Sequence, residues 1–185
     1  MPRPRMLPDE AILDAARDIV HREGPASLSF GALAAAVGLA GSTLVQRFGT
    51  KDGLLRATLL HAWDRLDRVT AAAIEAAPDG AAGVGELFVA MTSDDEDDYV
   101  EQLPVLREDL RDPVLRARGA RWLATLAAAV DARLPDAPPG TGRLLVAQWQ
   151  GILTVWAFTR DGALARAVRE GIAELLTRVG CAPAP

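Results

Sequence analysis

The stretch Ser29–Lys51, SFGALAAAVGLAGSTLVQRFGTK, decides the fold of the N-terminal part of the chain. It predicts two short helices, Phe30 to about Val37 and about Gly41 to Phe48, joined by a turn at Gly38. Ser29 is a residue type that caps a helix, and glycine supplies the positive φ that a sharp turn requires. The apolar residues that would form the small core between these helices are Leu33, Val37, Leu39, Leu44 and Phe48. Small Ala34 lets the helices cross closely, so the spacing is that of a helix-turn-helix.

The flanking residues predict one helix on each side of this motif. Acidic residues after Pro8 favour a helix start there, because a helix N-terminus carries partial positive charge. Apolar residues then recur at helical spacing until Gly24-Pro25 ends the helix. After the motif, Thr50 can cap a long helix that begins at Lys51 and ends before Pro78.

The remaining sequence is also typical of helices. We expect them at residues 82–93, 99–111 (with Pro104 interrupting or starting the stronger part), 113–134, 143–160 and 163–179. No segment alternates between apolar and polar residues, so we expect no sheet. The fold class is therefore all-α, with about nine helices.

Composition excludes several classes of protein. The 185 residues are 50% hydrophobic and 24% charged, as in ordinary globular proteins. A single cysteine, Cys181, excludes an intramolecular disulfide and a cysteine-rich zinc site. The chain has no run of apolar residues long enough to span a membrane, and its start, MPRPRMLPDE, lacks the apolar segment of a signal peptide. We therefore expect a cytoplasmic protein.

Charge is unevenly distributed along the chain. Residues 1–56 carry seven Lys and Arg and six Asp and Glu, a net charge of +1, whereas residues 57–185 carry 13 and 19, a net charge of −6. The net charge of −5 and pI near 5.1 do not by themselves indicate a nucleic-acid-binding protein. Because all the excess acid lies in residues 57–185, the overall net charge does not argue against nucleic-acid binding by the N-terminal part.

Residues 9–66 as a whole resemble the DNA-binding domain of the TetR family of transcriptional regulators. The resemblance rests on the segments ILDAARDIVHREG, AAAVGLAGSTL and QRFGTKDGLL and on the long helix that follows. It implies a helix-turn-helix DNA-binding domain at residues 1–50. It also implies a helical ligand-binding and dimerisation domain at 51–185, in which 51–77 form a long connecting helix.

Two positions depart from the family's pattern. Ala40 stands where a capping Ser usually opens the recognition helix, and losing such a cap costs about 1 kcal/mol. Ser42 is placed to compensate in part. Val45 stands where the family usually has a Tyr that contacts phosphate. Either Gln46 or Arg47 replaces that contact, or affinity for DNA is lower.

Docking of a helix-turn-helix places the N-terminal half of its second helix against base edges in the major groove. Gly41, Ser42 and Thr43 would then lie nearest the bases. One turn further on, Gln46 is suited to adenine, and Arg47 to guanine or to phosphate. The alternative is that these are plain surface residues of a short helix.

Phosphate contacts are expected from the helix ends. The positive charge of Lys51 is unfavourable in the first turn of its helix, where the helix dipole is also positive. A phosphate bound at this helix N-terminus would compensate for it. Ser29 can combine its cap with a phosphate contact. Arg3 and Arg5 either enter a minor groove as an arm or belong to a plain tail, and the tail is the more common case.

The last two helices are the expected dimer element, as the resemblance also implies. The apolar band from Leu144 to Phe158 exceeds what one buried face needs. The residues assigned to the interface are Gly151, Val155, Leu164, Val168, Ile172 and Leu175. A monomer that buries both helices internally is the alternative.

A ligand site among the central helices is the family's usual arrangement. The residues expected to line it are Phe88, Met91, Tyr99, Trp122, Trp149 and Trp156, with Gln148 or Gln150 as a polar contact. Such residues favour an apolar or amphipathic small molecule. Plain core packing is the alternative for each of them.

Other chemistry finds little support. Aligned as a calcium loop, the acidic run Asp94–Asp98 puts Tyr99 where glycine is needed and Val105 where a bidentate Glu is needed. We therefore expect a solvated loop and no metal or cofactor. The two histidines lie in different predicted helices, and no nucleotide-binding or hydrolase motif appears, so we expect no enzyme.

Together these observations predict a ligand-responsive repressor that acts as a homodimer on a palindromic DNA operator. The alternative is a helical small-molecule-binding or interaction protein whose DNA-binding head has lost specific binding, as Ala40 and Val45 suggest. A third interpretation is an activator that binds DNA in the same way, although repression is the more common behaviour in the family.

Overall fold

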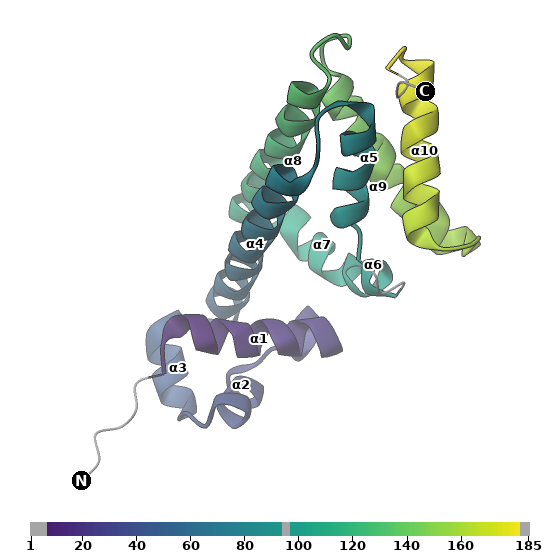
Figure 1. Ribbon diagram of the computed structural model, residues 1–185. Helices are drawn as coiled ribbons and strands as arrows, with labels where there is room; N and C mark the ends of the chain where they lie inside the picture. The colour runs from purple at the N-terminus through teal and green to yellow at the C-terminus, as the bar shows by residue number, and fades with distance from the viewer. Residues whose placement is uncertain (1–6, 94–96, 182–185) are drawn as a thin grey trace. The chain divides into compact units, whose positions relative to one another are not determined.

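The computed structural model describes residues 7–93 and 97–181, and all regular structure in these residues is helical. The elements are α1 (Asp9–Glu23), η1 (Pro25–Ser27), α2 (Phe30–Val37), α3 (Gly41–Phe48), α4 (Lys51–Ala76), α5 (Gly80–Ala90), α6 (Asp98–Glu101), α7 (Leu103–Arg111), α8 (Pro113–Arg133), α9 (Thr141–Thr159) and α10 (Leu164–Arg178) (Figure 1). The predicted all-α class is confirmed. Nine of these α-helices have eight residues or more, and α6 has four. The expected helix at 99–111 is divided into α6 and α7 because Pro104 lies in the first turn of α7.

The chain forms two compact units. The first comprises the chain up to Arg65 together with Glu101–Arg118, and the second comprises Leu66–Val100 and the residues from Gly119 on. Helices α4 and α8 therefore contribute residues to both units. The first unit, called the head below, extends past residue 50 because residues of α4 and α8 complete its core.

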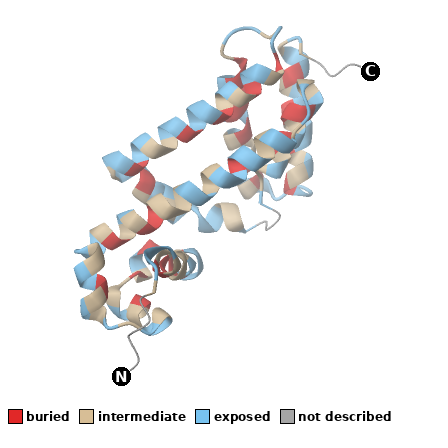
Figure 2. Cartoon of the chain, turned by 60° about the vertical axis from the view of Figure 1, so that its left-hand side comes forward, coloured by how far each residue is buried: buried red, intermediate tan, exposed pale blue. Residues whose placement is uncertain are grey.

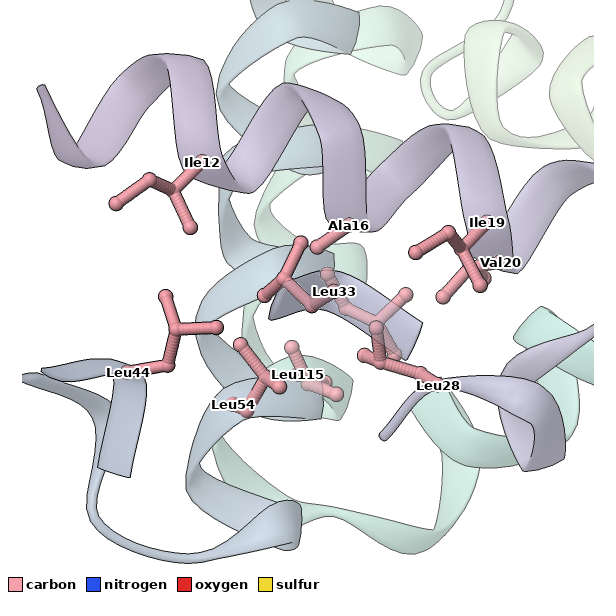
Figure 3. Close-up of a cluster of buried hydrophobic side chains, with 10 residues drawn as sticks. Ile12, Ala16, Ile19, Val20, Leu28, Leu33, Leu44, Leu54 and Leu115 are labelled. Carbon is pink, nitrogen blue, oxygen red and sulfur yellow. The ribbon is translucent and has the colours of Figure 1, made fainter. Parts of the chain in front are cut away.

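The core of the head lies beneath one apolar face of α1. Ile12, Ala16, Ile19 and Val20 recur at helical spacing and are all buried. They meet residues of five other segments, as Figure 3 shows; the buried members outside α1 are Leu28, Leu33, Leu44, Leu54, Leu59 and Leu115. Burial of each such leucine stabilises the fold by about 1.5–3 kcal/mol, so this cluster is the main attachment of α2 and α3 to the rest of the head.

The second unit is built around α9. Helix α10 packs against both α9 and α5 through its buried apolar face. The start of α9 approaches α8 closely, because a Cβ on Gly142 would lie 2.1 Å from the carbonyl oxygen of Ala127. Arg133 of α8 donates to the carbonyl oxygens of Ile74 and Ala77, which satisfies acceptors at the end of α4. In Figure 2, buried positions recur along the helices between exposed ones, as amphipathic helices require. None of the described helices combines the length and apolar character that a membrane span needs.

Asp109 is a buried carboxylate in the head. Only 8% of the residue is exposed, and its Oδ1 accepts a hydrogen bond of 3.1 Å from Nε1 of Trp63. Burial raises the pKa of Asp109, and the hydrogen bond from Trp63 opposes the rise. Nearby Asp112 behaves in the opposite way. Burial alone would raise its pKa, but hydrogen bonds from Arg56 and from the backbone of α8 outweigh burial and lower the pKa.

The two glycines of α5 predict opposite effects of alanine. A Cβ on Gly83 would lie 1.7 Å from the carbonyl oxygen of Pro78, whereas a Cβ on Gly85 meets nothing within 4 Å. Gly83→Ala must move backbone, so we expect it to lower the free energy of unfolding by about 1–3 kcal/mol. Gly85→Ala should raise it by about 0.5–1 kcal/mol through helix propensity. Denaturant unfolding followed by circular dichroism measures both, and equal effects at the two positions would contradict this packing.

The two carboxylates predict opposite dependences on pH. The folded pKa of Asp109 is raised, so its charge destabilises the fold at neutral pH, and this penalty disappears as pH falls through the folded pKa. Asp109→Asn should therefore be more stable than wild type near pH 7, by a margin that shrinks toward acid. The folded pKa of Asp112 is lowered, so Asp112→Asn should be less stable near neutral pH, and that loss should vanish at low pH. Urea unfolding across this pH range measures both, and a destabilised Asp109→Asn at neutral pH would refute the burial argument.

Candidate DNA interface

The helix-turn-helix consists of α2 and α3, and its local geometry follows from three residues. Ser29 caps α2, because its Oγ accepts a hydrogen bond of 3.1 Å from the backbone N–H of Ala32. Gly38 adopts φ 69° and ψ 26°, the left-handed conformation in which glycine is least strained. Its N–H bonds to the carbonyl oxygen of Ala34, which closes the last turn of α2. The predicted cap and turn are both confirmed.

The start of α3 lacks a side-chain cap, as Ala40 predicts. Ala40 has extended backbone angles, and no side chain of the described residues accepts from the first N–H groups of the helix. Gly41 follows, and a Cβ there would meet nothing within 4 Å. Packing inside the head therefore does not require this glycine, and the space outside it is open to another molecule.

One face of α3 is polar and exposed. Ser42 and Gln46 are exposed, Thr43 is half-buried, and Leu44 points into the core. Val45, on the same outer side, is 45% exposed. The face therefore presents a hydroxyl and an amide, which can donate and accept hydrogen bonds, beside one apolar side chain. Ser42, Thr43 and Gln46 of this face are among the residues that the sequence assigned to base contact, with Gly41 and Arg47.

Arg47 faces α1. Its Nη1 donates to the carbonyl oxygen of Leu7 at 2.7 Å and to Oδ1 of Asp9 at 3.0 Å. The side chain is 22% exposed, whereas that of Asp9 is 65% exposed. Sequence reasoning missed both partners, because 38 and 40 residues separate them from Arg47 and neither interaction follows from spacing.

The junction of α3 and α4 is tight. The Oγ1 of Thr50 accepts from the N–H of Gly53 at 3.0 Å, so the predicted cap of α4 is confirmed. A Cβ on Gly53 would lie 2.5 Å from the carbonyl oxygen of Phe48. Exposed Lys51 donates to the carbonyl oxygen of Ala26 at 3.0 Å, so its ammonium lies next to the η1 turn that precedes Ser29. Lys51 and Ser29, the two residues predicted to bind phosphates, therefore lie on the same edge of the head.

A polar contact ties α4 to α1. Nε2 of His61 lies 3.0 Å from Oδ1 of Asp14, and the same carboxylate oxygen is 3.3 Å from Nη1 of Arg17. The hydrogen bond with His61 is the largest cause that lowers the pKa of Asp14, and the Arg17 charge adds to it. The carboxylate is therefore held in its charged form, which favours a fixed arrangement of α1 and α4.

The aromatic residues predicted to line a ligand site divide into two groups. Phe88, Trp122 and Trp149 form a cluster, with ring centroids 5.4 Å apart for Phe88 and Trp149 and 6.3 Å apart for the two tryptophans. Trp156 is buried, donates to the carbonyl oxygen of Gly162 at 2.9 Å, and has the guanidinium of Arg160 4.7 Å from its ring centroid.

The indole N–H groups of the cluster are bound to threonines. Nε1 of Trp149 donates to Oγ1 of Thr92 at 3.0 Å, and Nε1 of Trp122 donates to Oγ1 of Thr70 at 2.8 Å. Each threonine in turn donates to the carbonyl oxygen of the residue four positions earlier in the chain. These relays fix the rings and leave their faces apolar.

The other predicted ligand contacts lie outside this cluster. Met91 is half-buried, and the hydroxyl of Tyr99 shares a hydrogen bond of 2.6 Å with Oγ1 of Thr154. Gln148 is a correction: it is exposed on α9, whereas Trp149 is buried, so Gln148 does not line the interior of the subunit. Gln150 is half-buried. Sequence spacing alone did not separate the two sides of an α9 that is apolar almost all round.

Three predicted dimer residues also need correction. Leu164, Val168 and Ile172 of α10 are 4%, 0% and 0% exposed within the single chain. They pack inside the subunit and have no surface left for a partner. Leu175 is half-buried, whereas Gly151 and Val155 of α9 are exposed. The large apolar residues exposed on α9 are Leu144 (55%), Val155 (62%) and Phe158 (88%).

Some expectations fall partly or wholly outside the described residues. Arg3 and Arg5 lie outside them, as do positions 94–96 of the acidic run. Asp97, at the end of that run, pairs with Arg160 at 3.0 Å. Among residues 7–93 and 97–181, no group of His, Cys, Asp and Glu is arranged to hold a metal ion.

A capped α2, a turn at Gly38 and an α3 with a polar outer face define a helix-turn-helix protein of the DNA-binding, transcription-regulating class. The family model for bacterial regulatory proteins of the tetR family matches residues 12–58. Together with a relative 30% identical to the chain over nearly its full length, this match shows that the chain belongs to the TetR family.

That relative is the multidrug binding protein EbrR, solved in complex with malachite green. The match covers 99% of this chain and 100% of EbrR, with a TM-score of 0.67. SCO1917 from Streptomyces coelicolor A3, a member of the TetR family, is 28% identical, over 96% of this chain and 100% of its own, with a TM-score of 0.69. A transcriptional regulator from Rhodococcus sp. Rha1 shares the fold at 19% identity, over 97% of this chain and 100% of its own, with a TM-score of 0.78. No curated protein gives a significant match.

Proposed function

We propose that this regulator is a ligand-responsive repressor that binds a palindromic operator as a homodimer. The observation that carries the proposal is the outer face of α3, where Ser42 and Gln46 are exposed on a helix anchored by buried Leu44. A short helix anchored on one side and polar on the other is what insertion into a major groove requires.

Each residue of this face has a defined role in the proposal. Gln46 pairs with an adenine through its amide, while Ser42 and Thr43 offer hydroxyl groups, and the Thr43 methyl fits a thymine methyl. Gly41 allows the backbone of α3 to approach the DNA closely, in keeping with the open space around it. Lys51 and Ser29 bind the phosphates beside the groove, where the N-terminus of α4 adds to the attraction.

The DNA-binding role is tested by fluorescence anisotropy with a duplex that the protein enriches from a random-sequence library. A scrambled duplex of the same composition is the control. We expect tight binding to the enriched duplex only, with a steep loss of affinity between about 50 and about 200 mM salt. Gln46→Ala should weaken it by about 1–3 kcal/mol and relax the preference at one base pair, whereas Gln102→Ala, at an exposed position away from α3, should not.

The same assay distinguishes the repressor from a second candidate function, a small-molecule-binding protein whose head no longer binds specific DNA. The uncapped α3 start at Ala40 and the exposed Val45 favour a head that no longer reads DNA. Weak and equal binding to the enriched and scrambled duplexes would support that candidate and contradict the repressor proposal.

A homodimer is needed because one helix-turn-helix reads few base pairs. Paired recognition helices about 34–36 Å apart read two half-sites. We assign the interface to the exposed face of α9, where Leu144, Gly151, Val155 and Phe158 recur at helical spacing. An apolar stripe of this kind favours a second helix as its partner, and Gly151, with nothing within 4 Å of its Cβ position, allows close approach.

The assignment predicts that Val155→Glu dissociates the dimer. Burying a carboxylate without a partner in an apolar interface costs several kcal/mol, so the dimer should be strongly weakened. Ala128→Glu, at an exposed position of α8, is the matched control. Light scattering coupled to gel filtration should give a monomer for Val155→Glu only, with weaker operator binding. A Val155→Glu dimer would refute the interface.

The ligand we propose is an aromatic, largely apolar molecule. Support comes from the cluster of Phe88, Trp122 and Trp149, whose N–H groups are satisfied and whose faces are apolar. EbrR, solved with malachite green and with proflavin, is 30% and 29% identical to the chain in these two comparisons. A ligand releases the protein from DNA only if it binds the conformation that cannot bind DNA more tightly than the one that can. Ligand and operator therefore compete for the protein.

Proflavin and malachite green are suitable probes of this site. Either should quench tryptophan fluorescence and release the enriched duplex in proportion to its binding. Trp149→Leu should abolish the ligand response, whereas Trp156→Phe, outside the cluster, should keep it. If both variants titrate like wild type, the site lies elsewhere.

A further inference from the structure

We propose that Arg47 is a positioning residue, which holds the recognition helix α3 against α1 and does not itself read a base. This inference rests on the proposed DNA-binding function. In it, Arg47 sets the orientation from which Ser42, Thr43 and Gln46 meet the groove.

The geometry of the guanidinium supports this role. The partners of Nη1 lie at the start of α1 or just before it: Oδ1 of Asp9 in its first turn and the carbonyl oxygen of Leu7 two residues earlier. A single Nη1 has two hydrogens, so both are used within the head. Nε and Nη2 make no hydrogen bond to the described residues, and the side chain as a whole is only 22% exposed. An arginine that reads a base through its two Nη groups needs both of them free, and Nη1 of Arg47 is already bound within the head.

The acceptors at α1 are themselves fixed. The Leu7 side chain packs against the head core, so its carbonyl oxygen is held in place. Pro8 follows, which restricts the backbone of Leu7 to extended conformations. Asp9 lies in the first turn of α1, where its charge suits the helix dipole. Arg47 thus joins the last turn of α3 to a rigid helix start.

Helix α3 has few other attachments. It is eight residues long, its only buried residue is Leu44, and its N-terminus has no side-chain cap. Beyond Phe48, Gly49 has φ 73° and ψ −90°. Half-buried Phe48, the last residue of the helix, also packs against the head core. These two apolar contacts fix the position of α3 but leave rotation about its axis weakly opposed. The polar attachment at Arg47 removes this freedom.

Asp9 offers a test in which two explanations predict opposite signs. Considered only as a charge, an acid close to the recognition helix repels phosphates, so its removal should strengthen binding. Considered as the partner of Arg47, its removal should weaken binding to the operator. Glu10 is the matched control, because it is also an exposed acid in the first turn of α1 and has no bond to Arg47.

The experiment compares Asp9→Ala and Glu10→Ala by anisotropy on the enriched duplex and on the scrambled one. Exposed ion pairs of this kind are worth up to about 1 kcal/mol, so we expect Asp9→Ala to weaken operator binding about threefold to fivefold. Its binding to the scrambled duplex should not weaken, so discrimination falls. Glu10→Ala should leave operator binding unchanged or stronger. If Asp9→Ala behaves like Glu10→Ala, the proposal is wrong.

Arg47 variants complete a double-mutant cycle. Arg47→Ala should reduce operator affinity by about tenfold, because the bond to a carbonyl oxygen is lost as well as the ion pair. Adding Asp9→Ala to it should then have no further effect, since the partner is already gone. Arg47→Lys keeps the charge and should retain the salt slope with intermediate affinity. Additive losses, or a salt slope about one unit smaller in Arg47→Ala, would indicate a direct phosphate contact and overturn the proposal.

A measurement without DNA separates this inference from the function on which it rests. Amide hydrogen exchange of α3 should be faster in Asp9→Ala than in Glu10→Ala, while the free energy of global unfolding differs between the two by no more than about 1 kcal/mol. If wild type fails to discriminate between duplexes, the proposed function fails, and exchange alone then decides whether Arg47 holds α3. Equal exchange in the two variants would overturn the inference.

Discussion

The packing of one apolar face of α1 over Leu33, Leu44 and Leu54 is the interaction on which the head depends. It places α2, α3 and the start of α4 against a single helix, and Leu115 of α8 completes the same core (Figure 3). The recognition helix contributes one fully buried residue to this core. Ser42, Val45 and Gln46 are therefore exposed and available for contacts outside the head, at the expense of a weaker attachment of the helix. The small number of buried residues in α3 thus explains both its exposed outer face and its weak attachment to the head.

Polar contacts between helices compensate for this shallow core. Arg47 joins α3 to the start of α1, Lys51 joins α4 to the η1 turn, and His61 joins α4 to Asp14 of α1. The groups that accept these contacts are the carbonyl oxygens of Leu7 and Ala26 and the carboxylates of Asp9 and Asp14. The head is thus a small core whose helix ends are tied together by charged side chains. The second unit is different, since its interior is apolar and its tryptophans bond to threonines and a carbonyl.

Local sequence predicted what local physics determines. The caps at Ser29 and Thr50, the turn at Gly38, the missing cap at Ala40 and the helix starts at Lys51 and Pro113 all follow from neighbouring residues. Partners far apart in the chain were not predictable, and Asp9 as the partner of Arg47 is the clearest case. Helical periodicity also failed where a helix is apolar on several sides. It placed Leu164, Val168 and Ile172 at a dimer interface, although α5 and α9 bury them, and it placed Gln148 inside although it is exposed.

The central claim is that two copies of this head read two half-sites of one operator. Hydroxyl-radical footprinting of the enriched duplex tests it most directly, because the cleavage pattern reports where the backbone is covered. The account predicts two protected patches on one face of the duplex, related by a two-fold axis and separated by one helical turn, about 34–36 Å, or a multiple of it. A single patch without symmetry, or uniform weak protection along the duplex, would contradict it.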